Sequence, residues 1–437
     1  MRILSITAGA GGMYCGSCFR DNALAAELIA RGHDVTLMPV YTPTRTDEEN
    51  VSRPDVLFGG ISVYLQQHSA LFRRTPRFVD RLWDSPGVIK AFAGRGVSTD
   101  ARLLGDLTIS MLEGERGLLK KEFDKLLEWT RDEPRPDVIN LPNSLLISMA
   151  APLKRALGAP VCCTLQGEEL FVERLQPAYR DETLSLIRRQ VPHVDRFVAV
   201  SEYCATFMAG FLGIPPAQMS VVPLGISLTG YTRRDPGGSR DEYRVGYFAR
   251  IAPEKGLSVL ADAYVRFRRR VGTARVKLEV AGYMSPNDAA YLEESRAVLA
   301  KAGLADEFAY HGELDRDAKL AFLQGLDVLS VPATYDEPKG VFLLEAMASG
   351  VPVVQPRRGT FTEVVEKTGG GLLVAPDDPE ALAEGLHAVW KDRNLAARLA
   401  QCAAEGIRAH YTIARSADRI LEVYESLGRR AATGASC

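Results

Sequence analysis

Two carboxylates separated by seven residues form the most informative chemical pattern in this chain. Glu337 and Glu345 flank Gly340, which is followed by an apolar run that favours a helix. A helix that begins there offers unpaired backbone N–H groups to an anion, and glycine lets a ligand approach the backbone closely. Carboxylates accept hydrogen bonds from vicinal hydroxyl groups. The pattern therefore predicts a site for a nucleotide sugar, which combines phosphates, a ribose diol and a hexose.

A second group of charged residues follows a predicted strand over residues 243–248. It contains Arg250 and Lys255, and Gly256 comes directly after the lysine. A diphosphate leaving group gains negative charge as a glycosidic bond breaks, and two fixed cations could neutralise that charge. A surface cluster of salt bridges is the alternative explanation for this arginine and lysine.

The segment 337–354 resembles the donor-sugar motif of retaining glycosyltransferases of family 4: Glu, seven residues, Glu, then Ala-Met-Ala, a small residue, Gly and Pro-Val-Val. The segment 250–256 is similar to the family's basic Glu-Lys-Gly stretch. The resemblance covers residues 245–377 well and the first half more loosely. It implies that Glu337 holds the hexose hydroxyls, Glu345 the ribose, and the N–H groups of Gly340 and Val341 the phosphate. The other donor-binding positions that it implies are Gly12, Gly282, Glu313, Leu314 and Phe342.

Three positions depart from the family pattern. Lys339 replaces a usual phenylalanine, Leu224 replaces a usual asparagine, and Gln166 replaces the histidine that contacts the donor sugar. Glutamine donates and accepts hydrogen bonds but takes no proton near neutral pH. The resemblance implies transfer on one face of the sugar, in which the leaving phosphate accepts the proton, so we keep Gln166 among the catalytic candidates. Glu168 either orients the acceptor hydroxyl or is, with Glu169, an exposed acid at a helix start.

Short apolar strands alternate with helical patterns in both halves, which predicts an α/β protein with parallel sheets. The resemblance implies the GT-B fold, in which two Rossmann-like, doubly wound domains face a central cleft. We expect an acceptor domain over residues 1–229, a nucleotide-sugar domain over 243–410, and a polar linker between them. A helix over about 413–428 is expected to return to the first domain, followed by a loose tail. The strands are predicted at residues 2–7, 33–38, 137–141, 161–165, 196–201, 219–222, 243–248, 277–281, 308–310, 328–331 and 351–355.

Two features of the first half have more than one explanation. The stretch 42–133 is long for a connection between strands, and its basic and aromatic segment 71–78 could shape the acceptor site, contact a membrane surface, or belong to an ordinary insertion. Cys15 and Cys18 form a C-x-x-C pair near a helix start, but one pair cannot complete a tetrahedral zinc site. We favour packing beneath a tight loop for these two residues.

Composition excludes several classes of protein. The net charge of −2 gives no reason to propose a nucleic-acid partner, and no apolar run approaches the ~20 residues that cross a bilayer. Seven scattered cysteines and a start without the layout of a signal peptide favour a cytoplasmic protein. The segment Asp315-Arg316-Asp317 has D-x-D spacing but is interpreted as a helix cap. Neither a metal nor a cofactor is expected.

The leading hypothesis is a retaining glycosyltransferase that moves a sugar from a UDP- or GDP-linked donor to a hydroxyl of a saccharide, small-molecule or lipid acceptor. Its catalytic candidates are Glu337, Arg250, Lys255, Gln166 and Glu168. The alternatives are a glucan synthase, a phosphorylase-like enzyme, a nucleotide-sugar-binding protein and an epimerase of nucleotide sugars. The phosphorylase version needs a lysine that carries pyridoxal phosphate, and no segment supports one. The sequence leaves the donor base, the sugar, the acceptor, the linkage and the oligomeric state open.

Overall fold

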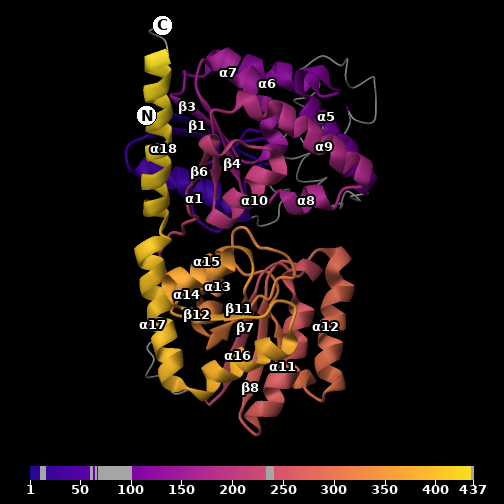
Figure 1. The fold of residues 1–437 in the computed structure, drawn as a ribbon. Helices are drawn as coiled ribbons and strands as arrows, with labels where there is room; N and C mark the ends of the chain where they lie inside the picture. The colour runs from indigo at the N-terminus through magenta and orange to yellow at the C-terminus, as the bar shows by residue number, and fades with distance from the viewer. Residues whose placement is uncertain (10–15, 60–62, 64–65, 67–100, 233–240, 435–437) are drawn as a thin grey trace. The chain divides into compact units, whose positions relative to one another are not determined.

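The structure, a computed structural model, describes residues 1–9, 16–59, 63, 66, 101–232 and 241–434. Contacts divide the chain into two compact units, Met1–Pro223 with Ser416–Cys437, and Leu224–Arg415. Each unit is a parallel sheet of six strands flanked by helices (Figure 1). The predicted α/β class with two Rossmann-like units is confirmed.

The first sheet has the order β2-β1-β3-β4-β5-β6, and all neighbouring strands pair in parallel. The chain moves outward from β1 to β2 and then returns to the other side of β1 for β3. The strand order therefore reverses between β1 and β3, and ligands of such sheets bind at the carboxyl ends there. The strands are β1 (Arg2–Thr7), β2 (Asp34–Pro39), β3 (Val138–Leu141), β4 (Val161–Leu165), β5 (Arg196–Ala199) and β6 (Met219–Val221).

Helices pack on this first sheet because their apolar residues recur on one face. In the first helix the buried positions include Cys18, Leu24, Ala25 and Leu28. The helices of this unit are α1 (Gly16–Ala30), α5 (Ala101–Glu113), α6 (Lys120–Asp132), α7 (Ala150–Leu157), α8 (Glu169–Glu173), α9 (Pro177–Gln190), α10 (Glu202–Leu212) and α18 (Ile413–Gly434). The last of these runs past residue 428, so the expectation of a loose tail from residue 429 was wrong as far as Gly434.

The second sheet has the order β12-β11-β10-β7-β8-β9, again with parallel neighbours only. Its order reverses between β7 and β10. The strands are β7 (Tyr243–Phe248), β8 (Val276–Ala281), β9 (Phe308–Tyr310), β10 (Val328–Leu329), β11 (Val353–Pro356) and β12 (Gly371–Val374). The sequence analysis missed β12, because one glycine opens it, two more precede it, and its residues are only half-buried at the edge of the sheet.

The helices of the second unit alternate with these strands. They are α11 (Leu257–Val271), α12 (Ala289–Lys301), α13 (Arg316–Gln324), α14 (Val341–Ala348), α15 (Gly359–Thr368), α16 (Pro379–Lys391) and α17 (Arg393–His410). The segment just before β7 also belongs to this unit. Arg316 donates to the carbonyl of Thr229 (2.6 Å), and Gln324 donates to Thr232 (2.8 Å). The boundary between the two units, after Pro223, therefore lies upstream of the segment between residues 229 and 243 that was predicted to be the linker.

The long stretch between β2 and β3 carries structure of its own, as its length predicts. Its described part includes α5 and α6, and Phe123 of α6 is fully buried against Phe58. The basic and aromatic segment 71–78 lies outside the described residues, so its three interpretations stay open.

Candidate functional site

The charged residues of the second unit lie where the strand order of its sheet reverses, between β7 and β10. Arg250 and Lys255 follow β7, and Glu337 lies in the loop after β10, the neighbouring strand. The carboxyl ends of parallel strands meet at one edge of the sheet. The topology therefore brings together residues that are more than 80 positions apart in the sequence, at the place where doubly wound sheets bind ligands.

A glycine allows these two loops to pack closely. Gly256 has φ +75°, and a Cβ atom there would lie 1.9 Å from the carbonyl oxygen of Pro332. Beside it, Thr334 donates its backbone N–H to the carbonyl of Glu254 (2.9 Å). Only a residue without a side chain permits this approach. As a result, Lys255 is held against the loop that carries Glu337.

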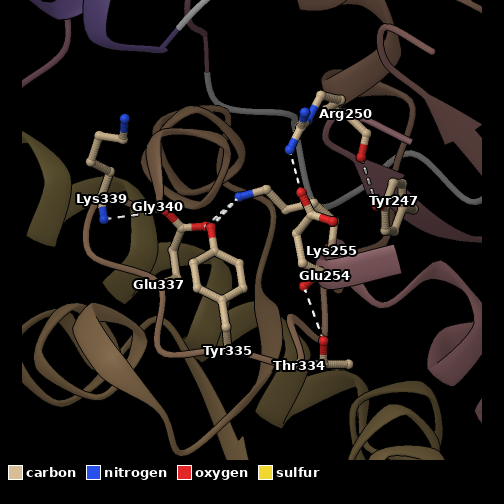
Figure 2. A network of polar contacts seen from close by, with 9 residues as sticks. All are labelled: Tyr247, Arg250, Glu254, Lys255, Thr334, Tyr335, Glu337, Lys339 and Gly340. Carbon is tan, nitrogen blue, oxygen red and sulfur yellow. Dashed lines mark hydrogen bonds and ion pairs between the residues drawn. The ribbon is translucent and has the colours of Figure 1, made fainter. Parts of the chain in front are cut away.

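Lys255 and Glu337 form an ion pair that Tyr335 completes (Figure 2). The Nζ atom of Lys255 lies 2.5 Å from Oε2 of Glu337, and the Tyr335 hydroxyl donates to the same oxygen at 2.5 Å. The other carboxylate oxygen accepts the backbone N–H groups of Lys339 (3.3 Å) and Gly340 (3.4 Å). Glu337 is 2% exposed, so this network takes the place of water around the carboxylate.

The network also fixes the charge of Glu337. Burial raises the pKa of this carboxyl, but the charge and hydrogen bond of Lys255, the Tyr335 hydroxyl and the charge of Lys339 outweigh it and lower the pKa to about 2. At neutral pH Glu337 is therefore an anion that accepts hydrogen bonds and has no proton to give. The side chain of Lys339 extends away from the carboxylate (Figure 2).

Arg250 lies at the same edge but has a different partner. Its guanidinium pairs with Glu254, and its backbone carbonyl accepts from Tyr247 at 3.1 Å. The side chain is 43% exposed, so it can still reach a ligand at this edge. The salt-bridge explanation thus describes what Arg250 does in the free protein, while Lys255 is joined directly to the Glu337 motif.

The second carboxylate of the motif lies on α14. Gly340 precedes that helix at φ +62°, and Phe342 in its first turn places its ring 5.6 Å from Nζ of Lys255. Further along, Oε1 of Glu345 accepts from Nζ of Lys319 (2.6 Å) and from the hydroxyl of Tyr231 (2.9 Å). Glu345 is 7% exposed, so its negative charge is compensated within the protein.

The sequence analysis missed three partners of these carboxylates: Tyr335, Lys319 and Tyr231. One signal was available for Lys319. It lies four residues before Leu323 on the buried face of α13, and a lysine at an apolar position implies a buried anion as its partner. Nothing in the sequence around the two tyrosines indicated that their hydroxyls reach a carboxylate.

The remaining donor-binding candidates lie after β8 and β9. Gly282 has φ +141°, its Cβ would lie 1.9 Å from the carbonyl oxygen of Ala249, and its N–H donates to the carbonyl of Gly312 (2.8 Å). The loops after β7, β8 and β9 are therefore in close contact with one another. Glu313 is exposed and Leu314 is half-buried. Asp315 caps α13 by accepting from the N–H of Ala318 at 2.9 Å, which confirms the interpretation of the D-x-D spacing as a cap.

The candidates of the first unit that the structure describes, Gln166 and Glu168, lie after β4. Glu168 accepts the backbone N–H groups of Ser144 (2.9 Å) and Gln166 (2.8 Å), so it ties the loops after β3 and β4 together. Glu168 and Glu169 are both buried, which contradicts the alternative of exposed helix-start acids. Gly12 and Cys15 lie outside the described residues. Cys18 is buried on α1.

Two family descriptions match nearly the whole chain. Residues 232–406 match "Glycosyl transferases group 1", and residues 22–225 match "Glycosyl transferase 4-like domain". The chain belongs to the group 1 glycosyltransferases of family 4. It is a glycosyltransferase, and the architecture of its two units is the GT-B fold.

Relatives with a described activity are transferases of several kinds. The chain is 29% identical to the GDP-mannose-dependent alpha-(1-6)-phosphatidylinositol monomannoside mannosyltransferase of Mycobacterium tuberculosis over 61% of this chain and 69% of that protein. It is 28% identical to the 2-deoxystreptamine N-acetyl-D-glucosaminyltransferase of Streptomyces fradiae over 69% of this chain and 74% of that protein. The two relatives are named for different sugars and acceptors, so family membership alone identifies neither for this chain.

Solved structures agree on the fold. Sucrose-phosphate synthase from Thermosynechococcus elongatus superimposes with a TM-score of 0.71 at 19% identity, covering 98% of this chain and 99% of that one. HepE of Anabaena in complex with UDP gives 0.68 at 18% identity, covering 98% and 100%. None of the helices within the described ranges combines the length and apolar character needed to cross a membrane.

Proposed function

We propose that this glycosyltransferase takes a nucleoside-diphosphate sugar as donor and retains the configuration of the anomeric carbon. The observation that carries the proposal is the contact of Lys255 with Glu337 beside the N-terminus of α14. One edge of the sheet thus offers a cation and backbone N–H groups suited to phosphate, and a carboxylate suited to hydroxyls.

Each group has a role that its surroundings support. The ammonium of Lys255 carries three N–H donors, so it can contact a phosphate oxygen while it stays paired with Glu337. As the glycosidic bond breaks, the charge that develops on the diphosphate is stabilised by Lys255, by Arg250 and by the N–H groups at the start of α14. Because Glu337 is ionised, its role is to accept hydrogen bonds from the hexose. Glu345 provides a second carboxylate for the ribose diol.

The donor and acceptor classes are proposed from the relatives. The Mycobacterium tuberculosis relative is named for GDP-mannose and a phosphatidylinositol mannoside, and the HepE structure contains UDP. We propose a UDP- or GDP-linked hexose as donor and a saccharide or lipid hydroxyl as acceptor. Metal independence is part of the proposal, because Lys255 and Arg250 supply the positive charge that a divalent cation would otherwise bring.

The test has two steps. Thermal unfolding is first measured with UDP, GDP, ADP, CDP and dTDP, with and without magnesium; a nucleotide at ~100-fold its dissociation constant should add about 2.7 kcal/mol of stability. Hexose donors of the stabilising nucleotide are then supplied, and the anomeric proton of the product is followed by NMR. A product with the configuration of the donor, formed in the presence of EDTA, supports the proposal. An inverted product, or a strict need for a divalent cation, contradicts it.

A further inference from the structure

The two oxygens of the Glu345 carboxylate have different surroundings within the second unit. Oε1 accepts from Nζ of Lys319 (2.6 Å) and from the hydroxyl of Tyr231 (2.9 Å). Oε2 bonds to none of the residues in the described ranges, and it does not belong to their buried unsatisfied atoms. Since an ionised carboxylate offers about four lone-pair sites, two on each oxygen, contacts within the protein occupy Oε1 and leave Oε2 open.

The open oxygen suits a pair of neighbouring hydroxyl groups. Two hydroxyls on adjacent carbon atoms, as in a ribose, can both donate to the lone pairs of Oε2. The contact requires the carboxylate to keep its orientation, because a rotation about its last bond would exchange the open oxygen for the occupied one. The terminal torsion of a glutamate is broad, so the side chain of Glu345 does not fix this orientation by itself. The donors on Oε1 must fix it.

The two donors on Oε1 contribute in different ways. Lys319 compensates the charge of Glu345, but its ammonium is a point charge at the end of a flexible chain. Tyr231 carries its hydroxyl on a rigid ring that is 5% exposed and lies 5.1 Å from the guanidinium of Arg316. The tyrosine hydroxyl therefore gives the contact its direction.

The segment that carries Tyr231 is fixed along α13. Residues 229, 230 and 232 lie against Arg316, Leu320 and Gln324, in that order. These three side chains recur every fourth residue and so share one face of the helix. The approach is closest at Gly230, which has φ +81° and where a Cβ atom would lie 2.7 Å from Cδ1 of Leu320. Tyr231 therefore cannot shift without breaking contacts on both sides of it.

We propose that Tyr231 is a positioning residue for the nucleotide: its hydroxyl holds Oε1 of Glu345, so that Oε2 faces both hydroxyl groups of the ribose. The inference rests on the proposed function, which assigns Glu345 to the ribose diol. It adds a residue that acts on the nucleotide through Glu345 and touches no ligand. It also states that one oxygen of the carboxylate takes the diol.

The variant Tyr231→Phe removes the hydroxyl and keeps the ring. Its affinity for UDP and GDP, measured by calorimetry, should fall about three- to tenfold for whichever nucleotide the wild type binds. The affinity for the 2′-deoxy form of that nucleotide should fall less, because a single hydroxyl depends less on the orientation of the carboxylate. The preference of the protein for ribose over deoxyribose should therefore shrink in Tyr231→Phe.

A double-mutant cycle shows whether Tyr231 acts through the carboxylate. Lys319→Met/Glu345→Met removes the ion pair without leaving a buried charge, and it should weaken nucleotide binding. Adding Tyr231→Phe to this background should change the affinity by less than about twofold, whereas a purely structural effect of the lost hydroxyl would lower it by the same factor in both backgrounds. If the background binds too weakly for calorimetry, the preference for ribose decides.

Tyr264 offers a matched control in the same unit. Its hydroxyl donates to Oε2 of Glu307 (2.8 Å), whose other oxygen accepts from Arg268 (2.7 Å). A tyrosine, a carboxylate and a cation thus meet here too, but Glu307 directly precedes β9, at the edge of the sheet opposite to the carboxyl ends. Tyr264→Phe should lower the melting temperature and leave the affinity for nucleotides and the preference for ribose unchanged.

Three results would overturn the inference. They are equal nucleotide affinity in wild type and Tyr231→Phe, an equal loss for the ribose and deoxyribose forms, and a wild type that binds both forms equally, since Glu345 would then not contact the diol. Failure of the proposed function looks different, because the wild type itself would then bind neither UDP nor GDP.

Discussion

Nζ of Lys255 lies 2.5 Å from Oε2 of Glu337, although 82 residues separate the two in the chain. Lys255 follows β7 and Glu337 follows β10, the two neighbouring strands between which the strand order of the sheet reverses. The pair thus depends on the topology of the whole sheet. The ammonium group of Lys255, which is suited to a phosphate, is therefore hydrogen-bonded to the carboxylate of Glu337, which is suited to hydroxyl groups.

Removing one partner of this pair should cost more than removing both. Lys255→Met leaves the buried Glu337 without its counter-charge, and we expect about 3–5 kcal/mol of lost stability together with loss of transfer. The double variant Lys255→Met/Glu337→Gln removes both charges, so it should regain part of that stability and remain inactive. Urea unfolding measures the first effect and product formation the second.

An exposed pair provides the control for the Lys255 experiment. Lys120 lies 3.1 Å from Asp124 on the surface of α6, and Lys120→Met should change stability by less than about 1 kcal/mol. A similar loss for Lys255→Met and Lys120→Met would show that the contact with Glu337 contributes no more than a surface pair.

The low pKa of Glu337 predicts how stability depends on acid. The folded protein lowers this pKa from 4.5 to about 2, so the carboxylate contributes stability that is present above pH 4.5 and is lost as the pH falls towards 2. The advantage of wild type over Glu337→Gln in the free energy of unfolding should therefore shrink by about 2 kcal/mol between pH 5 and pH 3. Glu380→Gln, at an exposed carboxylate, should show a smaller change. A gap between wild type and Glu337→Gln that stays constant with pH would contradict this explanation.

Substitutions of the two carboxylates of the motif should affect different properties of the enzyme. Glu345→Gln removes the charge opposite Lys319 and should weaken binding of the free nucleoside diphosphate, since we assign Glu345 to the ribose. Glu337→Gln should bind the nucleotide nearly as well as wild type but turn over more slowly, because its contacts are with the hexose. Calorimetry with UDP or GDP and steady-state kinetics separate the two effects. Equal nucleotide affinity in wild type and Glu345→Gln would refute this division.

Most of the fold could be predicted because its signals are local. Strands such as residues 161–165 and 243–248 are short apolar runs between turn residues, and the structure reproduces their bounds. The strand at the edge of the second sheet and the end of the last helix were harder to predict. Strand β12 is only half-buried, and α18 continues through Ala431-Ala432, where helix propensity outweighs the lack of a marked apolar pattern.

The two carboxylates of the site could be predicted from the sequence, whereas most of the residues that contact them could not. The spacing of Glu337 and Glu345 around Gly340 encodes a loop and a helix start, which sequence shows directly. The contacts of Tyr231 and Lys319 with Glu345 join segments more than 20 residues away, and they exist only once α13 and α14 pack side by side. Burial of Glu168 likewise follows from two backbone N–H groups in separate loops, which no local pattern announces.

Gly256 should be essential because of what surrounds it and not only because of its backbone angle. At φ +75° any other residue is strained, and a Cβ atom would also lie 1.9 Å from the carbonyl oxygen of Pro332. Gly256→Ala should therefore push the loop after β7 away from the loop after β10 and pull Lys255 from Glu337. Gly213 is a matched control, with φ +70° and nothing within 4 Å of the position of its Cβ.

Gly213→Ala should cost only the strain of the left-handed conformation, about 1–2 kcal/mol, and leave transfer unchanged. Gly256→Ala should cost clearly more and should abolish transfer even at temperatures where the variant is folded. Circular dichroism gives the two melting temperatures, and product formation below both gives the activity. If the two alanine variants were equally stable and equally active, close packing of the two loops could not be what holds Lys255 against Glu337.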